Sequence, residues 1–126
     1  MREIKFRVYN KHTKKMYEVE WLSFRHNLLI VSANEDWERQ QKLSDFELMQ
    51  YSWLKDINWK EIYEWDIVKW FYNYSVEINK AVVWFRIGRF EINTFRCIPL
   101  YEFLLWNETK LEIIWNIYEN PDLLNN

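Results

Sequence analysis

Three acidic side chains, Glu61, Glu64 and Asp66, stand close together in the middle of the chain. In the β-strand that we expect over residues 61–69, Glu64 and Asp66 share one face and Glu61 lies on the other. Two carboxylates on one face could bind a cation or act as a general acid and base. A solvated strand edge beside Lys55 and Lys60 explains the same residues without chemistry, and we favour that interpretation.

The histidines and the cysteine show no catalytic or metal-binding pattern. His12 lies in a polar turn and His26 follows Arg25, and no ligand spacing links the two. Cys97 is the only cysteine of the chain, so an intrachain disulfide is excluded. Its apolar surroundings in the sequence do not suit a reactive thiol, which needs an electropositive setting. We therefore expect no catalytic residues, metal or cofactor, and predict that the protein is not an enzyme.

Residues 84–96 interleave aromatic side chains with arginines, a composition that suits nucleic-acid binding. Aromatic rings can stack on bases, at about 1–3 kcal/mol per base, while guanidinium groups hold phosphates. If this segment alternates as strands do, Arg86 and Phe90 share one face and Arg89 and Phe85 the other, so neither face is purely basic. The net charge of −2 adds no general attraction to nucleic acid or acidic lipid. The candidate residues are Trp84, Arg86, Arg89, Phe90 and Arg96.

Nine tryptophans stand against a single glycine, Gly88. Several follow or precede turn-forming residues, as in Asp36-Trp37 and Asn58-Trp59, where glycine is the expected residue. A tryptophan at the positive φ of such turns costs about 1–3 kcal/mol. Either the tryptophans are real and the protein has adapted to them, or the gene uses a code in which UGA means glycine and was translated with tryptophan. We favour the recoded gene.

Short segments of alternating hydrophobicity predict a mainly β protein. We expect strands over residues 4–8, 17–20, 28–31, 46–54, 61–69, 76–78, 81–87, 90–98 and 111–118. The first two form an N-terminal hairpin, residues 34–44 form a long loop, and Asn79-Lys80 forms a turn. Residues 56–60 would form a type I′ hairpin turn if position 59 were glycine. Pro99 opens one short helix that extends to Leu105.

This pattern is typical of a small barrel or roll. We divide the chain into a hairpin and loop region, residues 1–45, and a β domain, residues 46–126, which together form one compact unit. No stretch approaches the roughly 18 apolar residues of a membrane span. The first residues also lack the apolar run of a signal peptide. We expect no membrane partner and a location in the cytoplasm.

The sequence LMQYSWLKDINWKEIYEWDIVK, residues 48–69, resembles the central motif of the YopX family, small proteins of bacteriophages and prophages. The family pattern reads approximately QYTGLKDKNGKEIYEGDIV, and Trp53, Trp59 and Trp65 stand at its glycines. The opening REIKFR with KMY at residues 15–17 resembles the family's first hairpin. The ending EIIWNIYENP, residues 112–121, resembles its closing IGNIYENP. The resemblance implies a mainly β fold with an SH3-type roll, common assembly into oligomers and no known activity.

The resemblance leads us to expect a phage or prophage accessory protein in the bacterial host cytoplasm. We expect it to bind proteins, to form homo-oligomers, and to inhibit a host defence protein; a nucleic-acid or nucleotide-binding module is the alternative. Real tryptophans exposed at turns would form apolar patches that favour association. We place the candidate binding surface on the motif loop, residues 53–63, because loops on a rigid scaffold often carry function. Its candidate residues are Trp53, Lys55, Asp56, Asn58, Trp59, Lys60 and Tyr63.

Overall fold

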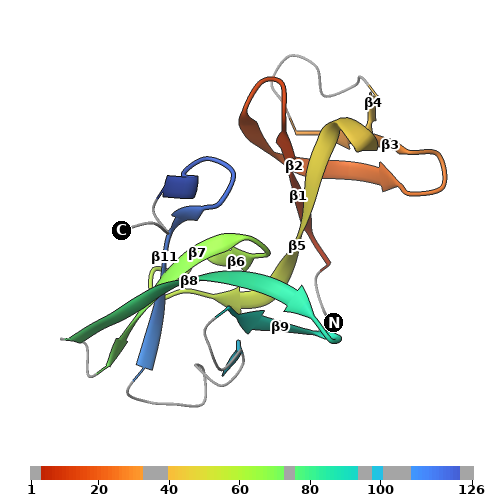
Figure 1. Ribbon diagram of the computed structural model, residues 1–126. Coiled ribbons are helices and arrows are strands. Elements are labelled where there is room, and N and C mark those ends of the chain that lie inside the picture. Colours follow the sequence, from red (N-terminus) through yellow and green to blue (C-terminus); the bar gives the residue numbers. More distant parts are fainter. Residues whose placement is uncertain (1–3, 33–39, 73–75, 94–97, 101–108, 123–126) are drawn as a thin grey trace. The chain divides into compact units, whose positions relative to one another are not determined.

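The computed structural model describes residues 4–32, 40–72, 76–93, 98–100 and 109–122, and this part of the chain is almost entirely β (Figure 1). All strand pairs are antiparallel. The elements are β1 (Phe6–Asn10), β2 (Lys15–Ser23), β3 (Leu28–Val31), β4 (Gln41–Lys42), the 3-10 turn η1 (Leu43–Asp45), β5 (Phe46–Lys55), β6 (Glu61–Tyr63), β7 (Asp66–Tyr72), β8 (Val76–Arg86), β9 (Arg89–Ile92), β10 (Ile98–Pro99) and β11 (Thr109–Asn116).

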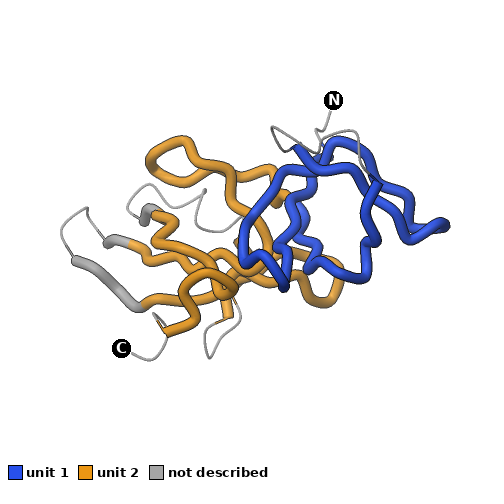
Figure 2. Tube along the Cα trace, turned by 90° about the horizontal axis from the view of Figure 1, so that it is seen from above, with its two compact units in different colours: residues 1–50 blue, residues 51–126 orange. Residues whose placement is uncertain are grey.

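The chain divides into two compact units, residues 1–50 and 51–126 (Figure 2). Strand β5 belongs to both. Its first half, residues 46–50, pairs with β1, and Tyr51 and Lys55 in its second half pair with Tyr63 and Glu61 of β6. Strand β5 therefore continues from the hydrogen-bonded sheet of the first unit into the second.

The first unit contains the predicted N-terminal hairpin, which is confirmed. Strands β1 and β2 pair from Arg7 opposite Glu18 to Asn10 opposite Lys15, and β3 coincides with the predicted residues 28–31. Apolar side chains of β1, β3 and β5 meet in a core of Val8, Leu29, Val31 and Phe46. The predicted loop over residues 34–44 is wrong at its end, because Leu28 and Leu29 of β3 provide backbone partners for β4. Residues 34–39 lie outside the described part.

The second unit is built on a five-stranded sheet of order β10-β9-β8-β7-β11. Its core comprises the side chains Ile62, Val68, Trp70, Ala81, Val83, Ile92, Leu100 and Leu111. Each aliphatic side chain buried in this way contributes roughly 1.5–3 kcal/mol. The β7–β8 and β8–β9 pairs, together with β11 on the other side of β7, form the frame that holds both candidate surfaces.

The predicted strand over residues 61–69 is wrong, because a turn divides it into β6 and β7. Trp65 has a φ of 67°, which an extended strand cannot accommodate. The carboxylate Oδ2 of Asp66 accepts a hydrogen bond of 2.8 Å from the amide of Tyr63 and so closes the turn. Glu64 and Asp66 consequently do not lie side by side on one face of a strand.

Three further predictions between residues 76 and 105 are corrected by the pairing. The Asn79-Lys80 turn is absent, since β8 runs continuously through it and takes up the extra length as a shift of register against β7. The predicted strand over residues 90–98 reverses direction, because Ile98 pairs with Ile92. Pro99 pairs with Glu91 as a strand residue and does not begin a helix there; residues 101–105 lie outside the described part.

The mainly β fold is thus confirmed, with two antiparallel sheets of six and five strands. Within the described residues, no pairing joins the outer strands of either sheet into a closed barrel. The SH3-type roll stays a prediction.

Candidate functional site

The tip of the motif loop is organised around the buried carboxylate of Asp56, which is 7% exposed. Its Oδ1 accepts hydrogen bonds from the amides of Asn58 at 2.8 Å and Lys60 at 2.9 Å. Its Oδ2 accepts one of 3.0 Å from the amide of Ile113 in β11. Asp56 therefore stabilises the turn and ties it to β11, and its oxygens are directed at the backbone and not at solvent.

This turn differs from the type I′ turn that we predicted. The amide of Trp59 donates to the carbonyl of Asp56 at 3.0 Å, and the amide of Asp56 donates to the carbonyl of Lys60 at 2.8 Å. The φ of Trp59 is 64°, whereas Asn58 is not in the left-handed region. A three-residue loop with one left-handed residue at its end produces this pattern, and that residue is commonly glycine.

Trp53 in the motif loop and Trp65 just after it also have left-handed backbones. Trp53, with a φ of 71°, lies where β5 has two more residues than β6 between their paired positions. Trp65, with a φ of 67°, donates its amide to the carbonyl of Val83 at 2.6 Å and accepts from the amide of Ile117 at 3.0 Å. The backbone at these positions thus shapes a bulge and a turn.

Only part of the candidate set in the motif loop faces solvent. Trp59 is 79% exposed, and Lys55, Asn58 and Lys60 are also exposed. The ammonium of Lys55 lies 5.6 Å from the centre of the Trp59 ring, a cation–π arrangement. Tyr63 is 6% exposed and packs against Tyr51, with 5.5 Å between ring centres. Trp53 is half-buried.

The second candidate surface is the arginine hairpin, residues 84–91, formed by β8, a two-residue turn and β9 (Figure 1). Ile87 and Gly88 have φ values of 54° and 75°, and two left-handed central residues define a type I′ turn. Arg86 is consequently paired with Arg89 and shares a face with it. Our prediction that these two arginines lie on opposite faces is wrong, because it treated the segment as extended through the turn.

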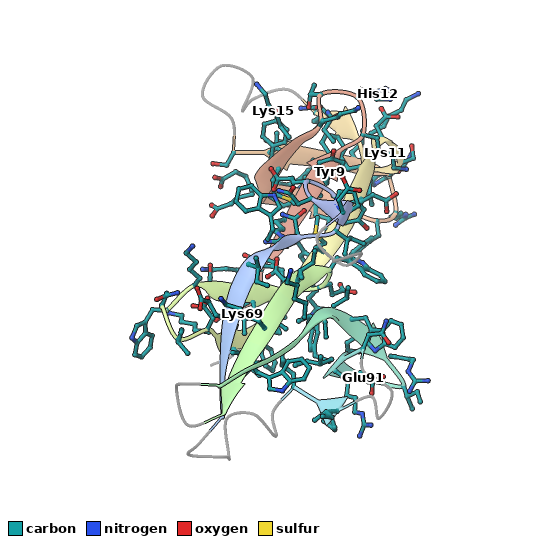
Figure 3. The ribbon with its side chains drawn as sticks, turned by 60° about the vertical axis from the view of Figure 1, so that its left-hand side comes forward. Tyr9, Lys11, His12, Lys15, Lys69 and Glu91 are labelled. Carbon is teal, nitrogen blue, oxygen red and sulfur yellow. The ribbon has the colours of Figure 1, made fainter. Side chains whose placement is uncertain are left out.

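The carboxylate of Glu91, which is labelled in Figure 3, accepts hydrogen bonds from three side chains of this face. Its Oε1 accepts from Arg86 Nε at 2.7 Å and from Trp84 Nε1 at 2.9 Å, and its Oε2 accepts from Arg89 Nε at 3.0 Å. The Glu91 side chain is fully buried, whereas both arginine side chains are about half exposed. The hydrogen bond from Arg86 lowers the pKa of Glu91 from its usual value, and the hydrogen bonds from Arg89 and Trp84 add to this effect, whereas burial opposes it.

The opposite face of the arginine hairpin is aromatic. Phe85 and Phe90 are cross-strand partners whose ring centres lie 5.0 Å apart at an angle of 72°. At the tip, Ile87 is 79% exposed and Phe85 is 48% exposed. The structure thus brings together Trp84, Arg86 and Arg89 and separates Phe90 from them; Arg96 lies outside the described residues.

Asp66, one of the acidic residues considered for catalysis, binds the backbone through its carboxylate. Asp66 is 1% exposed and closes the turn after β6. Among the described residues, no three histidine, cysteine or acidic side chains are grouped so that they could hold a metal ion. The same part of the chain contains no helix long and apolar enough to cross a membrane. Cys97 lies outside the described residues.

Sequence reasoning missed two residues of the arginine hairpin, Ile87 and Glu91. The pair Ile87-Gly88 between two strand-like segments could have indicated a two-residue hairpin turn. Such a turn places Arg86, Arg89 and Glu91 on one face. Burial of Glu91 could not be foreseen, since glutamate is almost never fully buried unless it is paired.

Two solved structures resemble this chain over nearly its whole length. The comparison with curated proteins found no match to this chain. The crystal structure of protein EF1440 from Enterococcus faecalis is similar over 98% of this chain and 99% of that one, with a TM-score of 0.72 and 24% identity. The structure of yopX from Bacillus subtilis covers 95% of this chain and 97% of its own, with a TM-score of 0.63 and 17% identity. These likenesses show the fold. The YopX protein family model matches residues 5–125, and the chain belongs to the YopX family.

Proposed function

We propose that this protein is a non-enzymatic accessory binding protein that contacts an acidic surface of a protein partner through the tip of the arginine hairpin. The observation that carries this proposal is Ile87, an isoleucine held in the left-handed region and 79% exposed at the tip. β-branched residues with positive φ are true outliers. Asparagine or glycine would form the same type I′ turn at less cost.

Strain of this kind is concentrated at functional sites, where another requirement outweighs it. The strain at such a position costs about 1–3 kcal/mol. The Ile87 side chain is too exposed for its burial in the folded chain to offset that cost. An exposed aliphatic side chain contributes free energy once it is buried, and a partner with an apolar pocket would provide that burial. We therefore assign Ile87 the role of the apolar anchor of the contact.

The arginines determine the charge of the partner. Arg86 and Arg89 both contact the carboxylate of Glu91, and both arginine side chains are about half exposed, so the face presents cationic groups to solvent. Both arginines are fixed through their Nε atoms, which reduces the side-chain entropy lost when a partner binds. Arginine is enriched at the energetic centres of protein interfaces. An acidic rim around an apolar pocket is the surface that matches this tip.

Family context supports one kind of partner. The resemblance that we identified connects the family with phages and prophages, and inhibition of a host defence protein is a niche for such proteins. This step rests on association and on no particular residue. A second copy of this chain is the other protein partner we consider, because we expect homo-oligomers.

Nucleic acid is the second candidate, and one observation favours it. Arg86 and Arg89 lie opposite each other on one face, and the Arg86 guanidinium lies 5.6 Å from the centre of the Trp84 ring. Phosphate contacts by two arginines would make the affinity fall steeply with salt. The aliphatic tip residue has no role in such a complex, which is why we place this candidate second.

The test compares the wild type with Ile87→Asn, which keeps a residue suited to the left-handed turn and removes the aliphatic anchor. Ile57→Asn in the motif loop is the matched control, because Ile57 is a 42%-exposed isoleucine in another turn. Host proteins captured from lysate are quantified by mass spectrometry, and the oligomeric state is measured by light scattering. Affinity for a generic single-stranded DNA is measured at two salt concentrations.

We expect a host protein, or a second copy of the chain, to bind the wild type and Ile57→Asn but not Ile87→Asn. Retention of every partner by Ile87→Asn contradicts the proposal. Salt-sensitive DNA binding that survives Ile87→Asn but is lost in the Arg86→Ala, Arg89→Ala double variant replaces it with the nucleic-acid candidate.

A further inference from the structure

Three tryptophans occupy backbone conformations that favour glycine. In the described part of the chain, six residues other than glycine have positive φ: Lys14, Asn27, Trp53, Trp59, Trp65 and Ile87. Left-handed residues other than glycine are a few per cent of positions, and asparagine and aspartate are several-fold enriched among them. Three tryptophans in a group of six is therefore a strong departure from what side-chain sterics allow.

The local geometry at each of the three positions explains why the backbone is left-handed. Position 59 ends a three-residue hairpin loop, the usual site of a left-handed glycine. Position 53 lies in a bulge of β5, and position 65 lies in the turn between β6 and β7. The hydrogen bonds that fix the turns at positions 59 and 65 are made by backbone groups and by aspartate carboxylates, so none of these bonds requires an indole.

Two other tryptophans, Trp70 and Trp84, have side chains that the fold requires. Trp70 is 7% exposed and belongs to the core of the second unit. Trp84 donates its indole Nε1 to the buried carboxylate of Glu91 at 2.9 Å. Neither has a positive φ, and both lie within strands. Glycine at position 70 would leave a large cavity, and glycine at position 84 would remove a hydrogen-bond donor from a buried charge.

We infer that the protein made by its native host has glycine at positions 53, 59 and 65 and tryptophan at positions 70 and 84. The gene would then use UGA as a glycine codon at the first three positions and UGG as the tryptophan codon at the other two. This inference is independent of the proposed function. It also assigns the exposed aromatic ring at the tip of the motif loop to translation with the wrong code, which removes that ring from the surface available to partners.

The decisive experiment combines the gene's codons with peptide mass spectrometry of the protein purified from its native host. We expect UGA and glycine at positions 53, 59 and 65, and UGG and tryptophan at positions 70 and 84. UGG codons at 53, 59 and 65, or native peptides that contain tryptophan there, overturn the inference. Glycine at position 70 or 84 overturns the division into two classes.

A recombinant series provides a second, physical test with the chain as written. Trp59→Gly removes both the side chain and the Cβ that makes positive φ costly, whereas Trp59→Ala removes the side chain and keeps the Cβ. Because Trp59 is largely exposed, little packing is lost in either variant. We expect Trp59→Gly to melt roughly 4 °C above Trp59→Ala. Equal melting temperatures would show that the position does not select glycine.

Trp70 and Trp84 supply the contrasting arm of the series. Trp70→Phe keeps an aromatic ring in the core and is expected to fold with a lower melting temperature, as is Trp84→Phe, which loses the indole donor. Either variant melting at or above the wild-type temperature would contradict the assignment of tryptophan to that position. A fall for both, together with the rise at position 59, supports the two classes.

Discussion

The motif loop and the arginine hairpin both reverse the direction of the chain in the second unit, but they do so with different residues. Each reverses an antiparallel strand pair through a left-handed residue, and each places a side chain that is 79% exposed on that strained backbone: Trp59 in one, Ile87 in the other. The recoding of UGA that we infer would account for the tryptophan. It would not account for the isoleucine, because UGA is not an isoleucine codon. Under our two proposals, the same backbone strain reflects translation in the motif loop and function in the arginine hairpin.

The buried carboxylates next to the two turns also differ in the groups that they bind. In the motif loop, the buried Asp56 accepts hydrogen bonds from the backbone and thus fixes the fold of the turn. In the arginine hairpin, the buried Glu91 accepts hydrogen bonds from side chains and thus fixes exposed cationic groups. A carboxylate that serves the backbone stabilises structure, whereas one that orients half-exposed arginines prepares a surface for binding.

Replacing Asp56 should have the largest effect on stability. Asp56→Ala leaves three backbone amides without their acceptor, and we expect a loss of about 3 kcal/mol in the free energy of unfolding. Urea denaturation measures this loss. Asp122→Ala is the control, because that aspartate is exposed. A loss no greater than that of the control would show that the turn does not depend on Asp56.

Glu91→Gln should come next. The amide retains one acceptor oxygen but loses the charge that pairs with Arg86 and Arg89, and we expect a loss of about 2 kcal/mol. Binding of the proposed partner should fall as well, because the arginines lose their fixed positions. Stability reduced with binding unchanged would mean that Glu91 serves the fold alone, as Asp56 does.

The contribution of the Glu91 carboxylate to stability should also appear in the pH dependence of the wild type. The hydrogen bond from Arg86 lowers the pKa of Glu91 in the folded protein, so the folded state favours the ionised form. The stability that it contributes is complete above the unfolded-state pKa and is lost as pH falls through the lowered folded-state pKa. The melting temperature is measured between about pH 6 and pH 3, the range over which carboxylates titrate. As the pH falls, we expect it to decrease less steeply for Glu91→Gln than for the wild type. Parallel declines would contradict the role of the buried charge.

Ile87→Asn should separate stability from binding at the tip. Asparagine suits the left-handed region, so we expect a gain of about 1 kcal/mol in the free energy of unfolding together with loss of the partner. Trp59→Gly should give a comparable gain with binding intact. Loss of binding in Trp59→Gly would erase the distinction between the two tips, and calorimetry with a binding assay on the same samples measures both quantities.

The smallest effect should come from Lys55→Ala. The ammonium of Lys55 lies over the exposed Trp59 ring, where a cation–π contact contributes about 0.5–1 kcal/mol. We expect a loss near the lower end of that range in the chain as written, and none in a Trp59→Gly background. A double-mutant cycle measured by urea denaturation tests this coupling. An equal loss in both backgrounds would assign the effect of Lys55 to another contact.

Much of the fold could be predicted from the sequence, because strand alternation is a local signal. The N-terminal hairpin, β3 and β11 follow directly from their apolar patterns. The turn at Trp65 was missed because the residue written there is a β-former, which concealed the need for a left-handed backbone. β10 was missed because its pairing with β9 depends on a reversal that no local pattern marks.

The candidate surfaces were predicted unevenly for a related reason. Motif residues were selected together, yet Asp56 and Tyr63 proved to be buried while Lys55, Asn58, Trp59 and Lys60 are exposed. Burial depends on contacts with β11 and β5, which lie elsewhere in the sequence. The faces of the arginine hairpin depended on recognising one two-residue turn, and an error there reversed the position of Arg89.

The order of the strands along the chain bears on how the protein is made on the ribosome. All pairings within the first unit join residues 6–50, so its sheet can form while the rest of the chain is still being synthesised. The second unit must wait, because β7 pairs with β11, whose residues are translated about forty positions later. Until then the edge of β7 remains open to other strands. Slow codons or a stalled ribosome between residues 72 and 109 would prolong that exposure and favour misassembly.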